Sequence, residues 1–170
     1  MVMTTTGLAR AREIAESVTD PELPMLTLAD LGVLRDVEIT AEGTVVVTLT
    51  PTYSGCPAMA EMRADVHRSL TADGFAQVRV RTALDPPWTT DWISPRGRRR
   101  LAEHGIAPPG AAPVRSAPVP LELEPPRARI RCPRCDSSRT EELSRFSATA
   151  CKALRRCTDC AEPFEHVKEI

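Results

Sequence analysis

The chain has 170 residues, of which 42% are hydrophobic, and this is enough for one modest domain with a small accessory module. Its 22 basic and 23 acidic side chains nearly cancel, so the overall charge gives no reason to expect an extended polyanion as partner. No apolar run reaches the length of about 18 residues that a membrane-spanning helix needs, and the N-terminus lacks a signal-peptide pattern. We therefore expect a cytoplasmic protein with no membrane partner.

The N-terminal half predicts a small α+β domain. Apolar residues recur at helical spacing over residues 7–18 and 58–70. Residues 33–40 and 44–50 are rich in β-branched side chains and flank a turn at Gly43, which predicts a hairpin. Alternation returns at residues 74–84 and predicts a third strand. The order of these elements predicts a three-stranded sheet with helices on one face.

A tryptophan-containing segment follows this domain. Trp88 and Trp92 are candidates either for a contact with a partner or for core packing. Ser94 stands at the N-cap of a short predicted helix, and Gly105 follows its last turn.

A proline-rich stretch predicts the domain boundary. Seven of the nineteen residues from 108 to 126 are proline, which is typical of an extended linker. We therefore expect a first domain at residues 1–107 and a second at residues 127–170.

The second domain carries two pairs of cysteines, each pair separated by two residues. Two such pairs can surround one tetrahedral metal ion, and the metal can supply folding free energy that a module of this size cannot obtain from burial. The pattern predicts a zinc ribbon with a structural Zn²⁺, with iron as the rival metal. The predicted ligands are Cys132, Cys135, Cys157 and Cys160.

Two further residues near the ribbon motif are candidates for substitute ligands. A structural zinc site closes at four ligands, so we expect Cys151 to be a core thiol and His166 a surface imidazole. Asp136 and Ala161 stand where glycine commonly follows the second cysteine of such a turn. Alanine tolerates the left-handed conformation poorly, which predicts some distortion near Cys160.

Basic residues gather at positions 96–100 and 127–135. The ribbon lacks the interleaved aromatic side chains that would stack on bases. We therefore interpret both runs as solvated or partner-facing surface, and nucleic acid as an unfavoured partner.

Cys56 stands apart from the other cysteines. Pro57 fits the first position of the predicted helix, which would place Cys56 at or beside its N-cap, where the helix dipole favours a thiolate. His67 lies about three turns further along the same helix, too far to activate the thiol as in a hydrolase. These residues leave two interpretations open, a reactive thiol and an inert buried cysteine.

Several segments resemble known families. The stretches VTDPELPMLTLADLGVLRDVEI and TLTPTYSGCPAM resemble the small domain of SufT-type iron–sulfur assembly factors over about residues 10–84. The stretches PPWTTDWISPRGRRRLAEHGIAPP and TACKALRRCTDC resemble the D subunits of the phenylacetyl-CoA epoxidase system, also called the phenylacetate-CoA oxygenase PaaJ or PaaD proteins.

This resemblance implies a non-catalytic accessory subunit of a multicomponent 1,2-epoxidase in aerobic phenylacetate catabolism, assisting iron or iron–sulfur maturation or assembly of the complex. It implies Cys56 as a transient iron or cluster ligand, with Asp20 and Glu22 near it. Its partners would be the epoxidase subunits and the iron–sulfur assembly machinery, and a homodimer stays open. Asp20 can equally cap the turn before Pro21.

Three other functions stay open beside this one. The chain could be an unreactive structural subunit of the oxygenase, with Cys56 inert. It could transfer electrons through a redox metal in the ribbon, or it could bind nucleic acid through the ribbon.

Overall fold

The computed structural model describes residues 2–110 and 130–169. Among these residues, close contacts define two units, one of residues 2–88 with 92–97 and one of residues 89–91 with 98–110 and 130–169. Most of the predicted linker lies outside the described residues.

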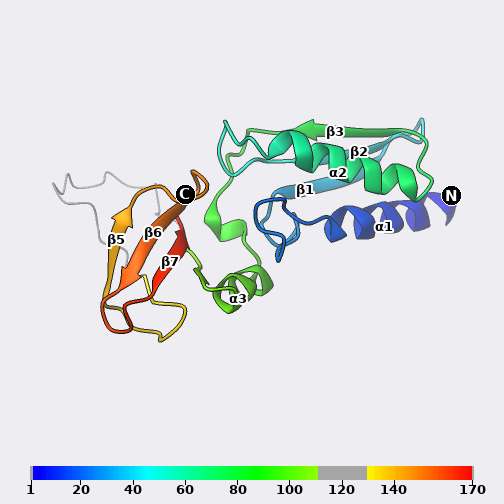
Figure 1. The fold of residues 1–170 in the computed structure, drawn as a ribbon. Coiled ribbons are helices and arrows are strands. Elements are labelled where there is room, and N and C mark those ends of the chain that lie inside the picture. The colour runs from blue at the N-terminus through cyan, green and yellow to red at the C-terminus, as the bar shows by residue number, and fades with distance from the viewer. Residues whose placement is uncertain (1, 111–129, 170) are drawn as a thin grey trace, which may run out of the picture. The chain divides into compact units, whose positions relative to one another are not determined.

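The first unit is a three-stranded sheet with two helices on one face (Figure 1). The strand order is β1-β2-β3; β1 pairs antiparallel with β2, and β2 pairs parallel with β3. The predicted α+β fold is therefore confirmed. Its elements are α1 Val2–Ser17, β1 Leu34–Ile39, β2 Val45–Leu49, α2 Met59–Ala72 and β3 Val78–Thr82.

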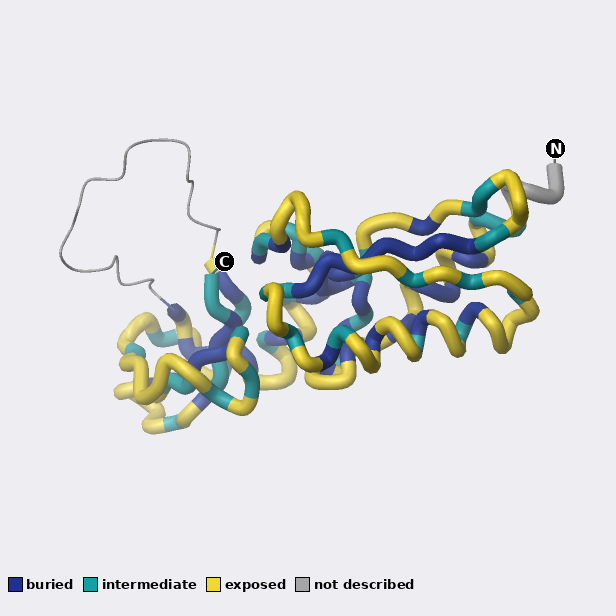
Figure 2. Tube along the Cα trace, turned by 90° about the horizontal axis from the view of Figure 1, so that it is seen from above, coloured by how far each residue is buried: buried dark blue, intermediate teal, exposed yellow. Residues whose placement is uncertain are grey.

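The central strand β2 is buried along its whole length (Figure 2). Val45, Val47 and Leu49 are fully buried, and their period of two places them on one face of the sheet. Buried Val66 and Leu70 of α2 and Ala11 and Ala15 of α1 supply helical residues of the same core. The apolar spacing seen in the sequence thus corresponds to the buried side of both helices.

A short segment after the sheet packs back onto this unit. Trp88 is buried and its indole N–H donates to the Leu31 carbonyl at 2.9 Å, so core packing is its role here. Gly32 adopts a φ of 69°, and an added Cβ would lie 2.5 Å from the Cβ of Trp92. Only glycine fits there, because a side chain would meet both backbone strain and this close contact.

Helix α3 (Pro95–Glu103) follows a 3-10 turn at Thr90–Trp92. The Ser94 hydroxyl accepts the Gly97 N–H at 2.9 Å, which confirms Ser94 as the N-cap. Gly105 has a φ of 76° and ends the helix as predicted.

The second unit contains a four-stranded sheet with the order β4-β7-β6-β5. The three longer strands form an antiparallel meander, and β4 adds to β7 in parallel. The strands are β4 Ile106–Ala107, β5 Thr140–Ser144, β6 Lys152–Cys157 and β7 Pro163–Val167.

Within the described part of the chain, every helix is too short or too polar to cross a membrane.

Candidate functional site

The four predicted ribbon cysteines come together in the second unit. All four Sγ atoms lie within 4.8 Å of one another, with Cys132 3.7 Å from Cys160 and Cys135 3.6 Å from Cys157. Four sulfurs at the corners of a tetrahedron with bonds of about 2.3 Å would be about 3.8 Å apart. The donor set and its spacing therefore fit one tetrahedral metal ion.

Two matching turns hold these sulfurs. The Cys132 N–H donates to the Ser137 carbonyl and the Cys157 N–H donates to the Glu162 carbonyl, both at 2.9 Å. Cys132 and Cys157 are buried in a small core with Ala107, Ile130 and Phe164, whereas Cys135 and Cys160 are exposed. One cysteine of each pair thus serves the core, and the other closes the site from the solvent side.

Backbone N–H groups prepare one of the thiols for metal binding. The amides of Cys160 and Asp159 outweigh burial and lower the pKa of the Cys157 thiol to about 7. An amide at Ser137 also favours the Cys135 thiolate, but burial and the three neighbouring thiols raise the pKa of Cys135 to about 12. A cation bound among the four sulfurs would favour the thiolate form and so promote loss of the Cys135 proton.

The residues after the second cysteine of each turn are left-handed, as the sequence predicts. Asp136 has a φ of 58° and Ala161 a φ of 60°. The first turn has a second bond, from the Asp136 N–H to the Cys132 carbonyl at 2.9 Å, and among the described residues no equivalent bond joins Ala161 to Cys157. This difference agrees with the distortion expected near Cys160. Holding alanine in the left-handed conformation at position 161 costs about 1 kcal/mol of stability.

Ala161→Gly is therefore expected to stabilise the metal-loaded ribbon by about 1 kcal/mol, because glycine adopts this φ without strain. Thermal unfolding of the full chain measures the gain. Asp136→Gly is the matched control and should gain less, because aspartate tolerates the left-handed region. Equal gains at both positions would contradict strain at Ala161.

Cys151 and His166 lie outside the four-cysteine cluster. The Cys151 sulfur is half-buried, 3.1 Å from the Thr149 hydroxyl. The prediction of a surface imidazole is wrong: His166 is 4% exposed, because β7 carries it into the sheet between β4 and β6. Its Nε2 lies 3.5 Å from a Glu169 carboxylate oxygen. Burial raises the pKa of Glu169, but His166 and the Gly110 N–H outweigh it and lower that pKa to about 2.

Cys56 lies in the loop between β2 and α2, half-buried and preceded by exposed Gly55. The predicted helix start is wrong by two residues: Ala58 is the N-cap and α2 begins at Met59. A turn in which the Met59 N–H donates to the Cys56 carbonyl at 3.3 Å comes first. Since the helix dipole acts within the first turn, it gives Cys56 less support as a thiolate than predicted.

Asp20 lies in the loop between α1 and β1. Its buried carboxylate accepts the backbone N–H groups of Glu22 and Leu23 at 2.9 and 2.8 Å, so it stabilises the turn after Pro21. Glu22 is exposed. This loop and the Cys56 loop lie at the same end of the sheet, where β1 begins and β2 ends (Figure 1).

Cys56, Asp20 and Glu22 do not form a cluster of ligands like that of the ribbon cysteines. Among the described residues, the ribbon cysteines form the one group of three or more potential ligands placed to hold a metal ion. Cys56, Asp20 and Glu22 therefore do not make a complete site by themselves.

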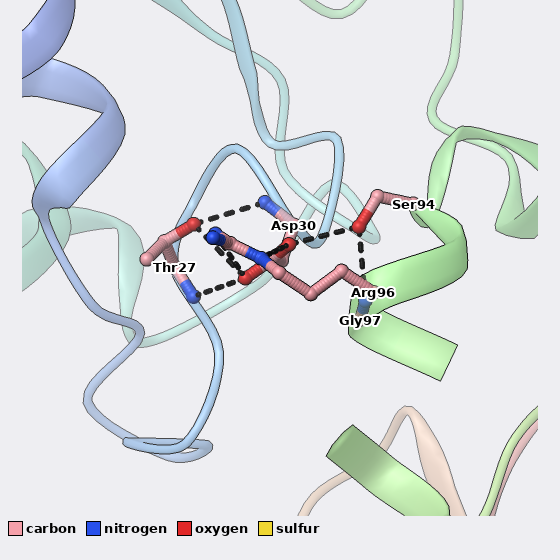
Figure 3. Close-up of polar contacts among 5 residues, drawn as sticks. All are labelled: Thr27, Asp30, Ser94, Arg96 and Gly97. Carbon is pink, nitrogen blue, oxygen red and sulfur yellow. Dashed lines mark hydrogen bonds and ion pairs between the residues drawn. The ribbon is translucent and has the colours of Figure 1, made fainter. Parts of the chain in front are cut away.

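Asp30 is a polar centre that the sequence did not reveal (Figure 3). Its buried carboxylate receives two hydrogen bonds from Arg96, both at 2.9 Å, and one from the Ser94 hydroxyl at 2.8 Å. Thr27 adds longer contacts from its N–H and hydroxyl. Burial raises the pKa of Asp30, but the bonds from Arg96, Ser94 and Thr27 outweigh it and lower the pKa to about 2.

Part of the basic run at residues 96–100 is used inside the protein. Arg96 binds Asp30, and Arg98 donates to the carbonyls of Pro109 and Thr90 at 2.6 and 2.7 Å. These two guanidinium groups form hydrogen bonds within the protein. Fewer arginines of the basic run are therefore available to bind a partner.

Comparison with known proteins agrees with both halves of this description. Residues 9–82 match the model of the iron–sulfur cluster assembly protein family, and residues 116–168 match that of the PaaD zinc beta ribbon domain. The Fe-S protein maturation auxiliary factor of Porphyromonas gingivalis is 34% identical over 79 residues, which cover 46% of this chain and 74% of that protein.

A solved structure supports the fold of the first unit. The crystal structure of a domain of unknown function, DUF59, from Bacillus anthracis has a TM-score of 0.54 and 25% identity, covering 59% of this chain and 95% of that chain.

One relative spans both domains. The putative 1,2-phenylacetyl-CoA epoxidase D subunit of Escherichia coli (strain K12) is 45% identical over 157 residues, which cover 92% of this chain and 90% of that protein. The chain therefore belongs to the family of 1,2-phenylacetyl-CoA epoxidase D subunits, with an iron–sulfur cluster assembly domain followed by a PaaD zinc β ribbon.

Proposed function

We propose that this protein is a non-catalytic accessory subunit that helps to mature or assemble the iron or iron–sulfur centres of a phenylacetyl-CoA epoxidase. The observation that carries this proposal is the 45% identity to an epoxidase D subunit across 92% of the chain. The match of residues 9–82 to iron–sulfur cluster assembly proteins supports a role in handling iron or iron–sulfur clusters.

In this proposal Cys56 is the residue that holds the cargo, an iron ion or an iron–sulfur cluster. Thiolate is the usual protein ligand of iron–sulfur clusters, and the Cys56 loop is partly exposed. An incomplete ligand set suits transfer, because the client protein can supply the remaining ligands and then retain the metal. Asp20 and Glu22 would assist from the neighbouring loop.

The ribbon metal has a structural role in this proposal. Four thiolates at tetrahedral spacing suit Zn²⁺, which has no redox chemistry and closes such sites at four ligands. The pure protein should therefore contain one zinc and be colourless. Visible absorption from iron bound by the four cysteines would instead favour electron transfer.

The proposed partners are the epoxidase subunits and the iron–sulfur assembly machinery, and the proposed location is the cytoplasm. A homodimer stays a prediction from the sequence.

Cys56→Ser is expected to reduce growth on phenylacetate and to leave the epoxidase underloaded with metal, because serine is a poor ligand for iron in this role. Growth of a host that carries the variant, together with metal analysis of its purified epoxidase, measures the effect. The matched control is Cys151→Ser, which removes a half-buried cysteine outside the ribbon cluster and should leave both unchanged.

Full growth and full metal loading with Cys56→Ser would overturn a role for this thiol. The remaining interpretation would then be an unreactive structural subunit of the oxygenase. Asp20→Asn refines the same experiment, because the amide oxygen can still accept the Glu22 and Leu23 N–H groups while the negative charge is lost. Reduced metal loading in a stably folded Asp20→Asn protein would support a ligand role beyond the turn.

A further inference from the structure

The strand β3 leaves one edge of the first unit's sheet open. It is the last strand in the order β1-β2-β3, and no further described strand pairs with it. The Val45 N–H donates to the Gln77 carbonyl, and the Ala83 N–H donates to the Leu49 carbonyl. The backbone groups of odd-numbered residues along β3 therefore face β2. In a parallel pair the alternate backbone groups, those of Val78, Val80 and Thr82, then point to the open side.

A shallow hollow lies beside this open edge. It is lined by residues of α2 and by Val80 of β3, and the α2 residues are Ala60, Arg63, Ala64 and His67. The two alanines leave the space, and the Arg63 guanidinium reaches over it to donate to the Val80 carbonyl at 3.3 Å. Leu84, two residues beyond the end of β3, is a large apolar side chain that is 59% exposed.

The charge around this edge is basic. Arg79 and Arg81 point to the face of the sheet opposite the helices, since they alternate with Val78 and Val80. Arg81 has one weak acidic contact, 3.6 Å from Glu38. No acidic side chain is among the described residues that line the hollow.

We propose that the open edge of β3 is a docking site for an extended segment of a partner protein in which acidic and apolar residues alternate. The backbone of the added strand would pair with the outward groups of β3, as in β-strand addition, and would replace the long bond from Arg63 to the Val80 carbonyl. Its apolar side chains would lie over the hollow and Leu84, and its acidic side chains would face Arg79 and Arg81. Cys56 is not among the residues that line the hollow, and the inference does not depend on the proposed function.

The test uses the full-length protein, labelled for amide NMR, and a short peptide of alternating glutamate and valine. We expect the amide signals of residues 78–84 and 60–67 to shift on titration, and the affinity to fall as salt is raised. Arg79→Glu and Arg63→Glu should each weaken binding about fivefold. Arg79→Glu reverses a charge that faces the acidic side chains of the peptide, and Arg63→Glu places a negative charge in the lining of the hollow that an acidic segment would cover. The matched control is Arg99→Glu, an exposed arginine of α3, which should bind as the unchanged protein does.

A peptide of alternating lysine and valine should not bind. Equal binding of the lysine peptide, shifts confined to other residues, or unchanged affinity in both Arg63→Glu and Arg79→Glu would overturn the proposal. In that outcome the arginines serve only to protect an edge strand from self-association. The spectrum of each unbound variant reports its fold, and the two variants test the edge independently.

Discussion

Cys157→Ser is expected to unfold the ribbon and to abolish its metal binding. Cys157 is fully buried, and its sulfur lies 3.6 Å from that of Cys135, so the substitution removes both a core side chain and a ligand. Structural zinc supplies about 10–16 kcal/mol to small domains of this kind, more than such a core can replace. The measurements are zinc content per chain and the amide NMR dispersion of strands β5 to β7.

Cys151→Ser serves as the control, since this thiol lies outside the cluster and should leave one bound zinc and a folded ribbon. A strong chelator added to the unchanged protein should reproduce the loss seen in Cys157→Ser. A folded ribbon in metal-free Cys157→Ser would show that the four-cysteine site is not what stabilises the second unit.

Asp30→Ala is expected to lower the free energy of unfolding of the first unit by about 2–4 kcal/mol at pH 7. The Asp30 side chain is 3% exposed, and its loss removes the paired bonds from Arg96 and the bond from Ser94. Arg96 is 57% exposed and can regain water, which keeps the loss below that of a fully buried pair. Urea unfolding followed by tryptophan fluorescence measures the change, because Trp88 and Trp92 lie in this unit.

The stabilisation by Asp30 depends on pH. Its pKa falls from 3.8 to about 2 on folding, so the folded state favours the charged carboxylate. The stabilisation is fully present above about pH 4 and is lost as the pH falls towards 2, and the pKa difference corresponds to about 2 kcal/mol. The difference between the unchanged protein and Asp30→Ala should shrink over this range.

Glu38→Ala is the matched control for Asp30→Ala. Glu38 pairs with Arg81 at 3.6 Å on the surface, with both side chains about half exposed, so its loss should cost less than about 1 kcal/mol. Similar losses from Asp30→Ala and Glu38→Ala would contradict a special role for the buried carboxylate.

Local patterns predicted most elements of the first unit. Alternating β-branched residues became β1, β2 and β3, and helical spacing became α1 and α2. The start of α2 was misplaced because Pro57 suits a helix's first position, yet Pro57 and Ala58 lie in a turn before it. Such boundaries depend on how the preceding loop packs, which spacing along the chain does not report.

The ribbon shows the same division between local and distant information. Cysteine spacing was enough to predict the cluster, because each pair sits in one tight turn. The burial of His166 was missed, because it follows from the parallel pairing of β7 with the two-residue strand β4, far away along the chain. No periodicity can identify a strand of two residues.

By itself the sequence determined the α+β class, the four-cysteine cluster and the N-cap at Ser94, because each arises from residues close together along the chain. Only the tertiary structure decided the environment of Asp30 and the open edge of β3. Asp30 and Arg96 are 66 residues apart, and their pairing exists only after the sheet brings both segments to one place. The partner of a buried charge and the open side of an edge strand both depend on contacts between distant segments, so only the folded chain reveals them.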